Sequence, residues 1–170
     1  MHEEIRGAVV AAALNIFETM FFIFLDPLES GSMTGPPVMA TTDPPPESSA
    51  SDSWIIKSEI SFSGMPSGRL LILFPYDLGQ LMTKNFLGFE DEVNEAQIFD
   101  MGSELSNMVC GNVFSLLDKK SVFSLGSPKT EKVPFEEKGK YIHPEDLVLD
   151  FSTEGNPVTI VVQLVQVQSS

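Results

Sequence analysis

The sequence predicts a single α+β domain in which long helices lie on one face of one β-sheet. The predicted elements follow the order helix, strands, helix pair, strands, which is the order expected when one αβ unit is used twice. The length of 170 residues and the hydrophobic content of 42% fit one domain with a sizeable core. We therefore interpret residues 1–170 as one folded unit.

The first predicted element is an almost unbroken apolar run from Ala8 to Leu25. An export signal begins with basic residues, whereas Glu3 and Glu4 precede this run, and a membrane span excludes acidic residues, whereas Glu18 lies inside it. The run is rich in alanine, leucine, methionine and phenylalanine, which favour a helix. We therefore expect a buried helix and no membrane segment.

The composition changes in residues 27–53. This segment holds six of the twelve prolines, has no lysine or arginine and has few large apolar residues. Such a segment cannot bury enough surface to offset its ordering entropy. We expect a flexible, acidic, Pro/Ser-rich insertion in the domain, and a proline-rich docking motif is the alternative.

Apolar patterns and turn residues predict the remaining elements. Gly64 and Pro66 separate the two strands of a predicted hairpin, and Asp77 is the expected N-cap of a short helix that Gly88 ends. The longest helical pattern runs from Glu90 to Leu117 and contains no proline. The predicted strands are Trp54–Phe62, Gly68–Tyr76, Val122–Leu125, Lys132–Phe135, Leu147–Phe151 and Pro157–Val167, the last with Gln163, Gln166 and Gln168 on a partly exposed face or edge.

Charge and cysteine content exclude several classes of function. Twenty-four acidic residues against ten basic ones give a net charge of -14, which repels phosphate backbones, so we expect no nucleic-acid partner. The single cysteine, Cys110, excludes an internal disulfide and fits a reducing cytoplasm; with only His2 and His143 it forms no usual zinc cluster. We interpret Cys110 as a small core residue, His143 as a surface histidine, and the chain as having no metal site. The GxSxG, GxxxxGK and GxGxxG motifs are also missing.

The predicted long helix carries a polar stripe. Glu104 and Asn107 are neighbours that point the same way, and Gly111, one turn further, removes a side chain that would block the approach of a partner. A stripe of this kind is most often a solvated helix face, and a functional surface is the alternative. On a 3.6-residue period the stripe contains Asp100, Glu104, Asn107, Gly111, Ser115 and Asp118, whereas Leu105, Met108, Val109, Asn112, Val113, Leu116 and Leu117 should face the sheet.

The pattern Asp100-x-x-x-Glu104-x-x-Asn107, followed by Gly111-Asn112 and Pro128, resembles the signature of the CheC, CheX and FliY phosphatases of bacterial chemotaxis. The string ELSNMVCGN is similar to the catalytic helix of CheX proteins, and the string NIFETM, at residues 15–20, is similar to their first helix. The resemblance covers most of residues 1–26 and 54–168.

Two features depart from the family pattern. Ser106 stands where glycine is common, and the acidic insertion is not part of the family core. The family is built on a pseudo-repeat, and some members have a second Glu-x-x-Asn in the first helix. In this chain Ala12 precedes Asn15, so we expect one complete site and interpret Asn15 as structural.

The resemblance implies hydrolysis of the aspartyl phosphate on a phosphorylated CheY-like response regulator in the bacterial cytoplasm. In that mechanism Asn107 orients the attacking water and Glu104 pairs with the lysine of the regulator. Asp100 and Gly111 belong to the partner contact, where Gly111 permits close approach of the helix. The regulator supplies the Mg²⁺, so the chain needs no cofactor of its own.

Two other functions stay open. The same fold could be a non-catalytic module that binds a receiver domain or a flagellar-switch-type partner. A purely structural dimer module would cover the polar stripe with another subunit. In either case we expect a homodimer, formed by edge pairing of an exposed C-terminal strand.

Overall fold

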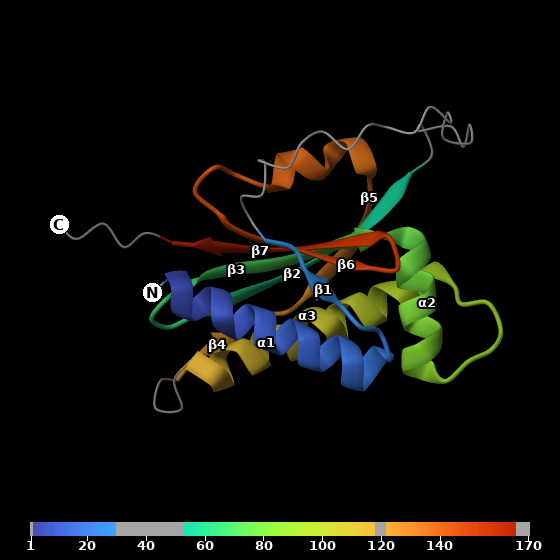
Figure 1. The fold of residues 1–170 in the computed structure, drawn as a ribbon, viewed down its shortest axis with the longest axis horizontal. Helices are drawn as coiled ribbons and strands as arrows, with labels where there is room; N and C mark the ends of the chain where they lie inside the picture. Colours follow the sequence, from blue (N-terminus) through green and yellow to red (C-terminus); the bar gives the residue numbers. More distant parts are fainter. Residues whose placement is uncertain (1, 30–52, 118–121, 166–170) are drawn as a thin grey trace.

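The computed structural model describes residues 2–29, 53–117 and 122–165 and has the predicted α+β architecture. Two long helices lie side by side on one face of an antiparallel sheet, α2 lies at their end, and η1 covers the other face (Figure 1). The elements are α1 (His2–Phe21), β1 (Asp26–Pro27), β2 (Trp54–Ser63), β3 (Gly68–Pro75), α2 (Tyr76–Leu87), α3 (Glu95–Leu117), β4 (Ser124–Leu125), β5 (Lys129–Pro134), η1 (Phe135–Tyr141), β6 (Leu147–Thr153) and β7 (Asn156–Leu164).

The order of the strands shows the predicted pseudo-repeat. The sheet runs β1-β6-β7-β3-β2-β4, and β5 also pairs with β2. The hairpin β2–β3 follows α1 and β1, just as the hairpin β6–β7 follows α3 and β5. The strand that precedes each hairpin pairs with the hairpin of the other unit, β1 with β6 and β5 with β2, and β3 pairs with β7 in the middle. The two units are thus interlocked in one sheet.

The main core lies between the sheet and the helices α1 and α3. Both helices contribute a stripe of apolar side chains, and alternate residues of the strands face them. Since each helix buries only one face, the sequence of α1 contains exposed residues between buried ones. Its buried residues are Ile5, Ala8, Val9, Ala12, Ala13, Ile16, Phe17 and Phe21.

The first helix ends four residues earlier than predicted. Phe22 has φ of 56°, and the backbone N–H of Ile23 donates to the carbonyl of Phe17 at 3.0 Å, which closes the helix. Beyond this point Ile23 and Leu25 are buried, whereas Phe22 and Phe24 are exposed. Alternate burial is typical of an extended segment. Because all four side chains are apolar, the sequence alone does not distinguish this segment from a continuation of the helix.

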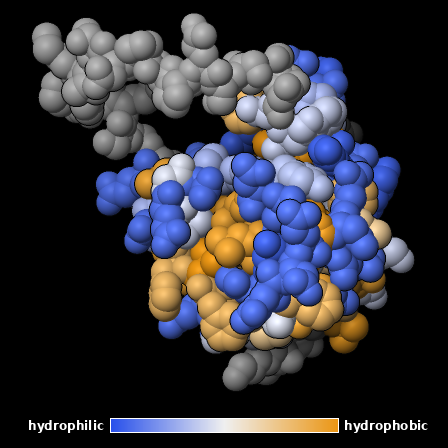
Figure 2. All heavy atoms as spheres, turned by 90° about the vertical axis from the view of Figure 1, so that its right-hand side faces the viewer, coloured by the Kyte–Doolittle hydropathy of each residue, from blue (hydrophilic) through white to orange (hydrophobic). Residues whose placement is uncertain are grey.

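Hydrophobic surface gathers at the end of the molecule that carries α2. Figure 2 looks onto this end and shows a hydrophobic area between hydrophilic borders. Phe22, Phe24 and Leu81 are exposed by 68%, 71% and 45% and line one hollow of about 160 Å³. Within the described residues no helix is long and apolar enough to cross a membrane.

The face of the sheet opposite the long helices has a smaller second layer. Lys57 lies in it with only 8% exposure, 2.9 Å from Glu131, 3.3 Å from Glu59 and 4.4 Å from the ring centre of Tyr141. Burial lowers the pKa of the Lys57 ammonium, but the hydrogen bonds and charges of Glu131 and Glu59 outweigh it, so the pKa is raised. The ammonium is therefore charged at neutral pH and holds β2 to β5 through Glu131.

Several predicted boundaries are wrong for local reasons. Asp77 is not the N-cap of α2; Pro75 takes that position and Asp77 lies in the first turn, although Gly88 ends the helix as predicted with φ of 70°. The C-terminal strand is not an edge, because β7 lies between β6 and β3 and Val158 to Val162 are buried. Edge pairing of β7 therefore gives no basis for the predicted homodimer.

Most of the predicted insertion at residues 27–53 lies outside the described residues, as do Asp118, Gln166 and Gln168. Where the segment is described, it is attached to the sheet. Pro27 pairs with Phe151, and the N–H of Leu28 donates to the carbonyl of Asp150 at 2.8 Å. At the other end the carbonyl of Ser53 accepts the N–H of Phe135.

Gly102 lies at a close contact of α3 with Thr130 of the sheet, and its replacement tests this packing. A Cβ at Gly102 would lie 2.7 Å from Cγ2 of Thr130, whereas a Cβ at Gly111 would meet only Leu125, at 3.9 Å. We predict that Gly102→Ala lowers the free energy of unfolding by about 1–2 kcal/mol through overpacking, although alanine favours a helix. Gly111→Ala should raise it by up to about 1 kcal/mol. Urea denaturation of both variants checks this, and a stable Gly102→Ala protein would contradict the packing.

Candidate functional site

The long helix α3 begins at a capping box. The N–H of Gln97 donates to Oδ1 of Asn94 at 2.8 Å, and the N–H of Asn94 donates to Oε1 of Gln97 at 2.9 Å. The helix therefore starts at Glu95. The predicted start at Glu90 is wrong. The spacing Asn94-x-x-Gln97 is the helix-start signal in the sequence. The acidic run before it also fits the first turn of a helix, which is why the predicted start lies too early.

A cluster of buried and half-buried hydroxyl groups fixes one turn of α3 to the sheet. Oγ of Ser58, on β2, donates to the carbonyl of Gly102 at 2.6 Å and lies 2.9 Å from Oγ of Ser106. Oγ1 of Thr130, on β5, lies 3.1 Å from Oγ of Ser58 and 3.0 Å from Oγ of Ser103. Ser58 and Ser106 are completely buried. The glycine at position 102 lets the helix come close enough for these contacts.

The polar stripe faces outward on the other side of this same turn. Asp100, Glu104 and Asn107 are exposed, and Gly111 is half-buried. Among the described residues no hydrogen bond or ion pair engages the side chains of Glu104 and Asn107. These residues are three positions apart on a regular helix, so their side chains are neighbours. A carboxylate and a carboxamide are thus presented together, with their polar atoms available to a partner.

The side of α3 that faces the sheet differs partly from the prediction. Leu105, Val109 and Val113 are buried as expected, but Leu116 is 55% exposed. The small residues Gly102, Ser106 and Cys110, spaced four apart, are also buried in this face. Small residues allow the close approach of helix and sheet, and their spacing is the signal in the sequence that was not used.

The first helix does not repeat this arrangement. Asn15 is exposed on α1, but Ala12, three residues before it, is completely buried and carries no polar group. A carboxylate at position 12 would lie in the core and could not reach a partner. Within the described residues, the pairing of an exposed glutamate with an exposed asparagine one turn later is therefore found on α3 and not on α1.

Cys110 and His143 lie where the sequence predicted them. Cys110 is completely buried, and burial raises the pKa of its thiol to about 12. His143 is a surface residue, 51% exposed, that lies near Asp146 and Glu145. The carboxylate of Asp146 accepts hydrogen bonds from the backbone N–H of His143 and from the side-chain amide of Gln163. These two bonds account for the position of Asp146 in the loop.

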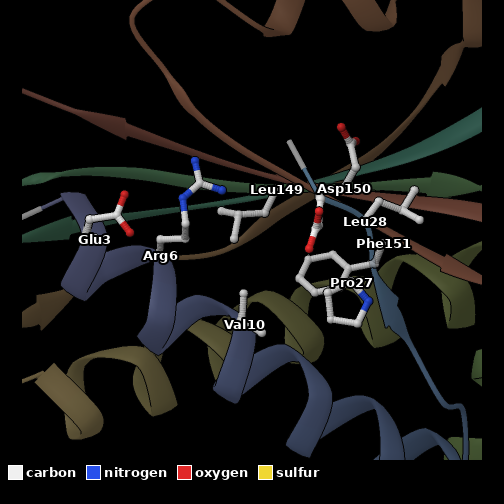
Figure 3. A pocket seen from close by; sticks show the side chains of 9 residues that line it. Glu3, Arg6, Val10, Pro27, Leu28, Leu149, Asp150 and Phe151 are labelled. Carbon is white, nitrogen blue, oxygen red and sulfur yellow. The ribbon is translucent and has the colours of Figure 1, made fainter. Parts of the chain in front are cut away.

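A hollow of about 500 Å³ lies away from the stripe, between the start of α1, the edge strand β1 and its neighbour β6. Figure 3 shows Glu3 and Arg6 of α1 on one side of it and Leu28 and Asp150 on the other. The described residues that line it include no carboxamide, hydroxyl or thiol side chain. This hollow therefore lacks the polar pair that the stripe on α3 presents.

Comparison with known proteins agrees with the signature on α3. Residues 56–132 match the family model described as chemotaxis phosphatase CheX, and this range includes most of β2, all of α3 and most of β5. This segment is similar to CheX. No curated protein sequence matches the chain. The resemblance to the CheC, CheX and FliY family is therefore confirmed over this segment by the family model.

Solved structures share the CheX-like fold over nearly the whole chain. The chemotaxis protein CheX from Vibrio vulnificus is similar with a TM-score of 0.70 and 18% identity, covering 97% of this chain and 99% of that one. A CheC-like superfamily protein from Shewanella sp. PV-4 has a TM-score of 0.68 and 19% identity, covering 98% and 100%. CheX in a CheX–CheY–BeF3–Mg complex from Borrelia burgdorferi has a TM-score of 0.63 and 16% identity, covering 95% and 97%.

The raised pKa of Cys110 leads to a prediction about its reactivity. A pKa of about 12 means that the thiol stays protonated at pH 8, and its burial also blocks access of reagents. We expect the native protein to resist iodoacetamide at pH 8 and to be alkylated rapidly in urea, where the pKa returns to its ordinary value. Mass spectrometry at timed intervals measures both rates. Rapid alkylation of the native protein would contradict the assignment of Cys110 to the core.

Proposed function

We propose that this chain is a phosphatase that hydrolyses the aspartyl phosphate of a CheY-like response regulator. The observation that carries the proposal is the exposed pair Glu104 and Asn107 on α3, within the segment that matches the chemotaxis phosphatase CheX. The similarity to CheX supports a phosphatase role in general. The similar structure from Borrelia burgdorferi contains CheY, which supports a CheY-like partner.

Asn107 is the residue that we assign to the chemistry. An acyl phosphate is an activated group, and the regulator holds the Mg²⁺ that neutralises it, so the helper protein needs to position a water molecule. A carboxamide carries one acceptor oxygen and two N–H donors on one planar group. Asn107 can therefore accept a hydrogen bond from the attacking water and donate one toward the phosphoryl group, which holds the water in line with phosphorus.

Glu104 is assigned to the recognition of the regulator. Its carboxylate would pair with the lysine of the regulator and so fix how α3 docks. A carboxylate close to a phosphoryl group is a poor general base, because the two negative charges repel each other. Asp100, one turn earlier on the same stripe, would extend the contact, and the half-buried Gly111 would let the partner approach the helix closely.

The net charge of -14 is consistent with the absence of nucleic acid from the proposal. We place the reaction in the bacterial cytoplasm, where response regulators are phosphorylated. A homodimer remains part of the proposal, although β7 cannot form it by edge pairing. If the chain binds a receiver without hydrolysing its phosphate, the non-catalytic module of the same fold is the correct assignment.

Substitution of the two residues tests the proposal. We predict that Asn107→Ala lowers kcat for dephosphorylation of a receiver by about a hundredfold or more, because one positioned polar group is lost. Glu104→Ala should chiefly raise KM, since it removes a docking contact. Both constants are obtained from the rate of phosphate release at several concentrations of a purified CheY-like receiver of the same organism, phosphorylated in the presence of Mg²⁺.

Matched controls come from the first helix. Asn15→Ala removes the same exposed carboxamide from α1, and Glu4→Ala removes an exposed carboxylate from a helix, and neither should change kcat or KM. Circular dichroism shows whether each variant is folded. If the unmodified chain binds a receiver but accelerates no decay, or if Asn107→Ala retains full activity, the catalytic assignment is wrong.

A further inference from the structure

We propose that Ser58, Ser106 and Thr130 are positioning residues that hold Glu104 and Asn107 in their working geometry. The proposal rests on the phosphatase function given above. It assigns a role to a polar cluster in which Ser58 and Ser106 are buried and Thr130 is half-buried, and which lies on the side of the turn opposite the exposed pair. The role is to fix the height and rotation of one turn of α3 relative to β2 and β5.

The contacts of the cluster all converge on the turn from Gly102 to Ser106. Ser58 donates to the carbonyl of Gly102 at 2.6 Å, and Oγ of Ser106 lies 3.3 Å from the same carbonyl and 3.2 Å from that of Ser103. Thr130 links Ser58 to Ser103, at 3.1 and 3.0 Å. Glu104 belongs to this turn and Asn107 follows it directly. Any movement of the turn is therefore a movement of the pair.

Hydrogen bonds constrain the helix more tightly than its apolar contacts do. A hydrogen bond weakens steeply with distance and angle, whereas apolar side chains tolerate small shifts by repacking. Ser58 and Ser106 are completely buried, so a helix that slid or rotated would leave their hydroxyls without partners and without water. The described structure has no unsatisfied buried side-chain N or O atom of this kind. The cluster therefore selects one setting of α3.

Thr83 shows what a buried hydroxyl does when it has no such role. It is also completely buried, but its Oγ1 donates at 2.6 Å to the carbonyl of Gly79, within its own helix α2. That bond does not connect α2 to the sheet. The hydroxyls of Ser58 and Thr130 differ because they come from two strands and meet a third element, so they determine how the elements sit against one another.

The experiment compares two replacements of threonine by valine, which has the same shape and no hydroxyl. We expect Thr130→Val to lower kcat for receiver dephosphorylation about tenfold and also to raise KM, because the carboxamide of Asn107 and the docking carboxylate of Glu104 are both displaced. Ser106→Ala should act in the same direction. Thr83→Val should lower thermal stability by a similar amount and leave kcat unchanged. Thr130→Ser keeps the hydroxyl and should restore kcat.

Hydrogen exchange supplies a readout that does not depend on activity. Backbone amides of residues 102–107 should exchange faster in Thr130→Val than in the unmodified chain, and they should be unchanged in Thr83→Val. If kcat and exchange are both unchanged in Thr130→Val, or if Thr83→Val lowers kcat equally, the positioning role is overturned. If the unmodified chain dephosphorylates no receiver, the proposed function fails. Hydrogen exchange then decides separately whether the cluster fixes the turn. Unchanged exchange of amides 102–107 in Thr130→Val overturns the positioning role as well.

Discussion

The arrangement of this molecule depends on how closely α3 approaches the sheet. Gly102 lies against Thr130. Next to it, Ser58 of the sheet and Ser106 of the helix are joined by a hydrogen bond where apolar side chains would ordinarily pack. A larger side chain at any of these positions would move the helix away. Because an α-helix is rigid, the position and rotation of this one turn also determine where the exposed side of the helix places Glu104 and Asn107.

Contacts at both ends of α3 act with this central one. At the start, Glu95 lies 3.6 Å from Nζ of Lys132, which itself lies over the rings of Trp54 and Tyr76, at 4.7 and 4.6 Å. Toward the C-terminal end, the ring of Phe114 packs between those of Phe62 and Phe123, at 4.8 and 4.1 Å between centres. The helix is thus held by an ion pair, a hydroxyl cluster and packed aromatic rings. An exposed polar pair on a helix held in this way is preorganised for a partner.

The interlocked repeat explains why one helix can carry the site while the other supports it. Both α1 and α3 cover the same face of the sheet (Figure 1), so both contribute to the core. On α1 the position three before Asn15 is Ala12, completely buried, whereas on α3 the position three before Asn107 is exposed. The difference of side chain and exposure at this one position distinguishes the two helices.

Local patterns made the fold class, the helices and the β2–β3 hairpin predictable, because periodicity and turn residues depend on neighbours in the sequence. The exposed stripe was predictable for the same reason. The hydroxyl cluster was not, because Ser58 is 44 residues from Gly102 and 72 from Thr130, and no local pattern places them together. The central place of β7 was missed for a related reason, since glutamines near its end suggested exposure while strand order is set by long-range pairing. Phe22 and Phe24 extended the apparent helix because exposed aromatic residues look like core residues in a sequence.

The most direct test is a crystal structure of the chain bound to a CheY-like receiver that carries Mg²⁺ and beryllofluoride in place of the phosphoryl group. The proposed function predicts that α3 lies over the aspartate that carries the beryllofluoride, with the carboxamide of Asn107 within hydrogen-bond distance of a fluoride and Glu104 beside the lysine of the receiver. The turn from Gly102 to Ser106 should keep its contacts with Ser58 and Thr130. A complex in which the receiver docks on the α2 end, or elsewhere with Asn107 in solvent, would contradict it.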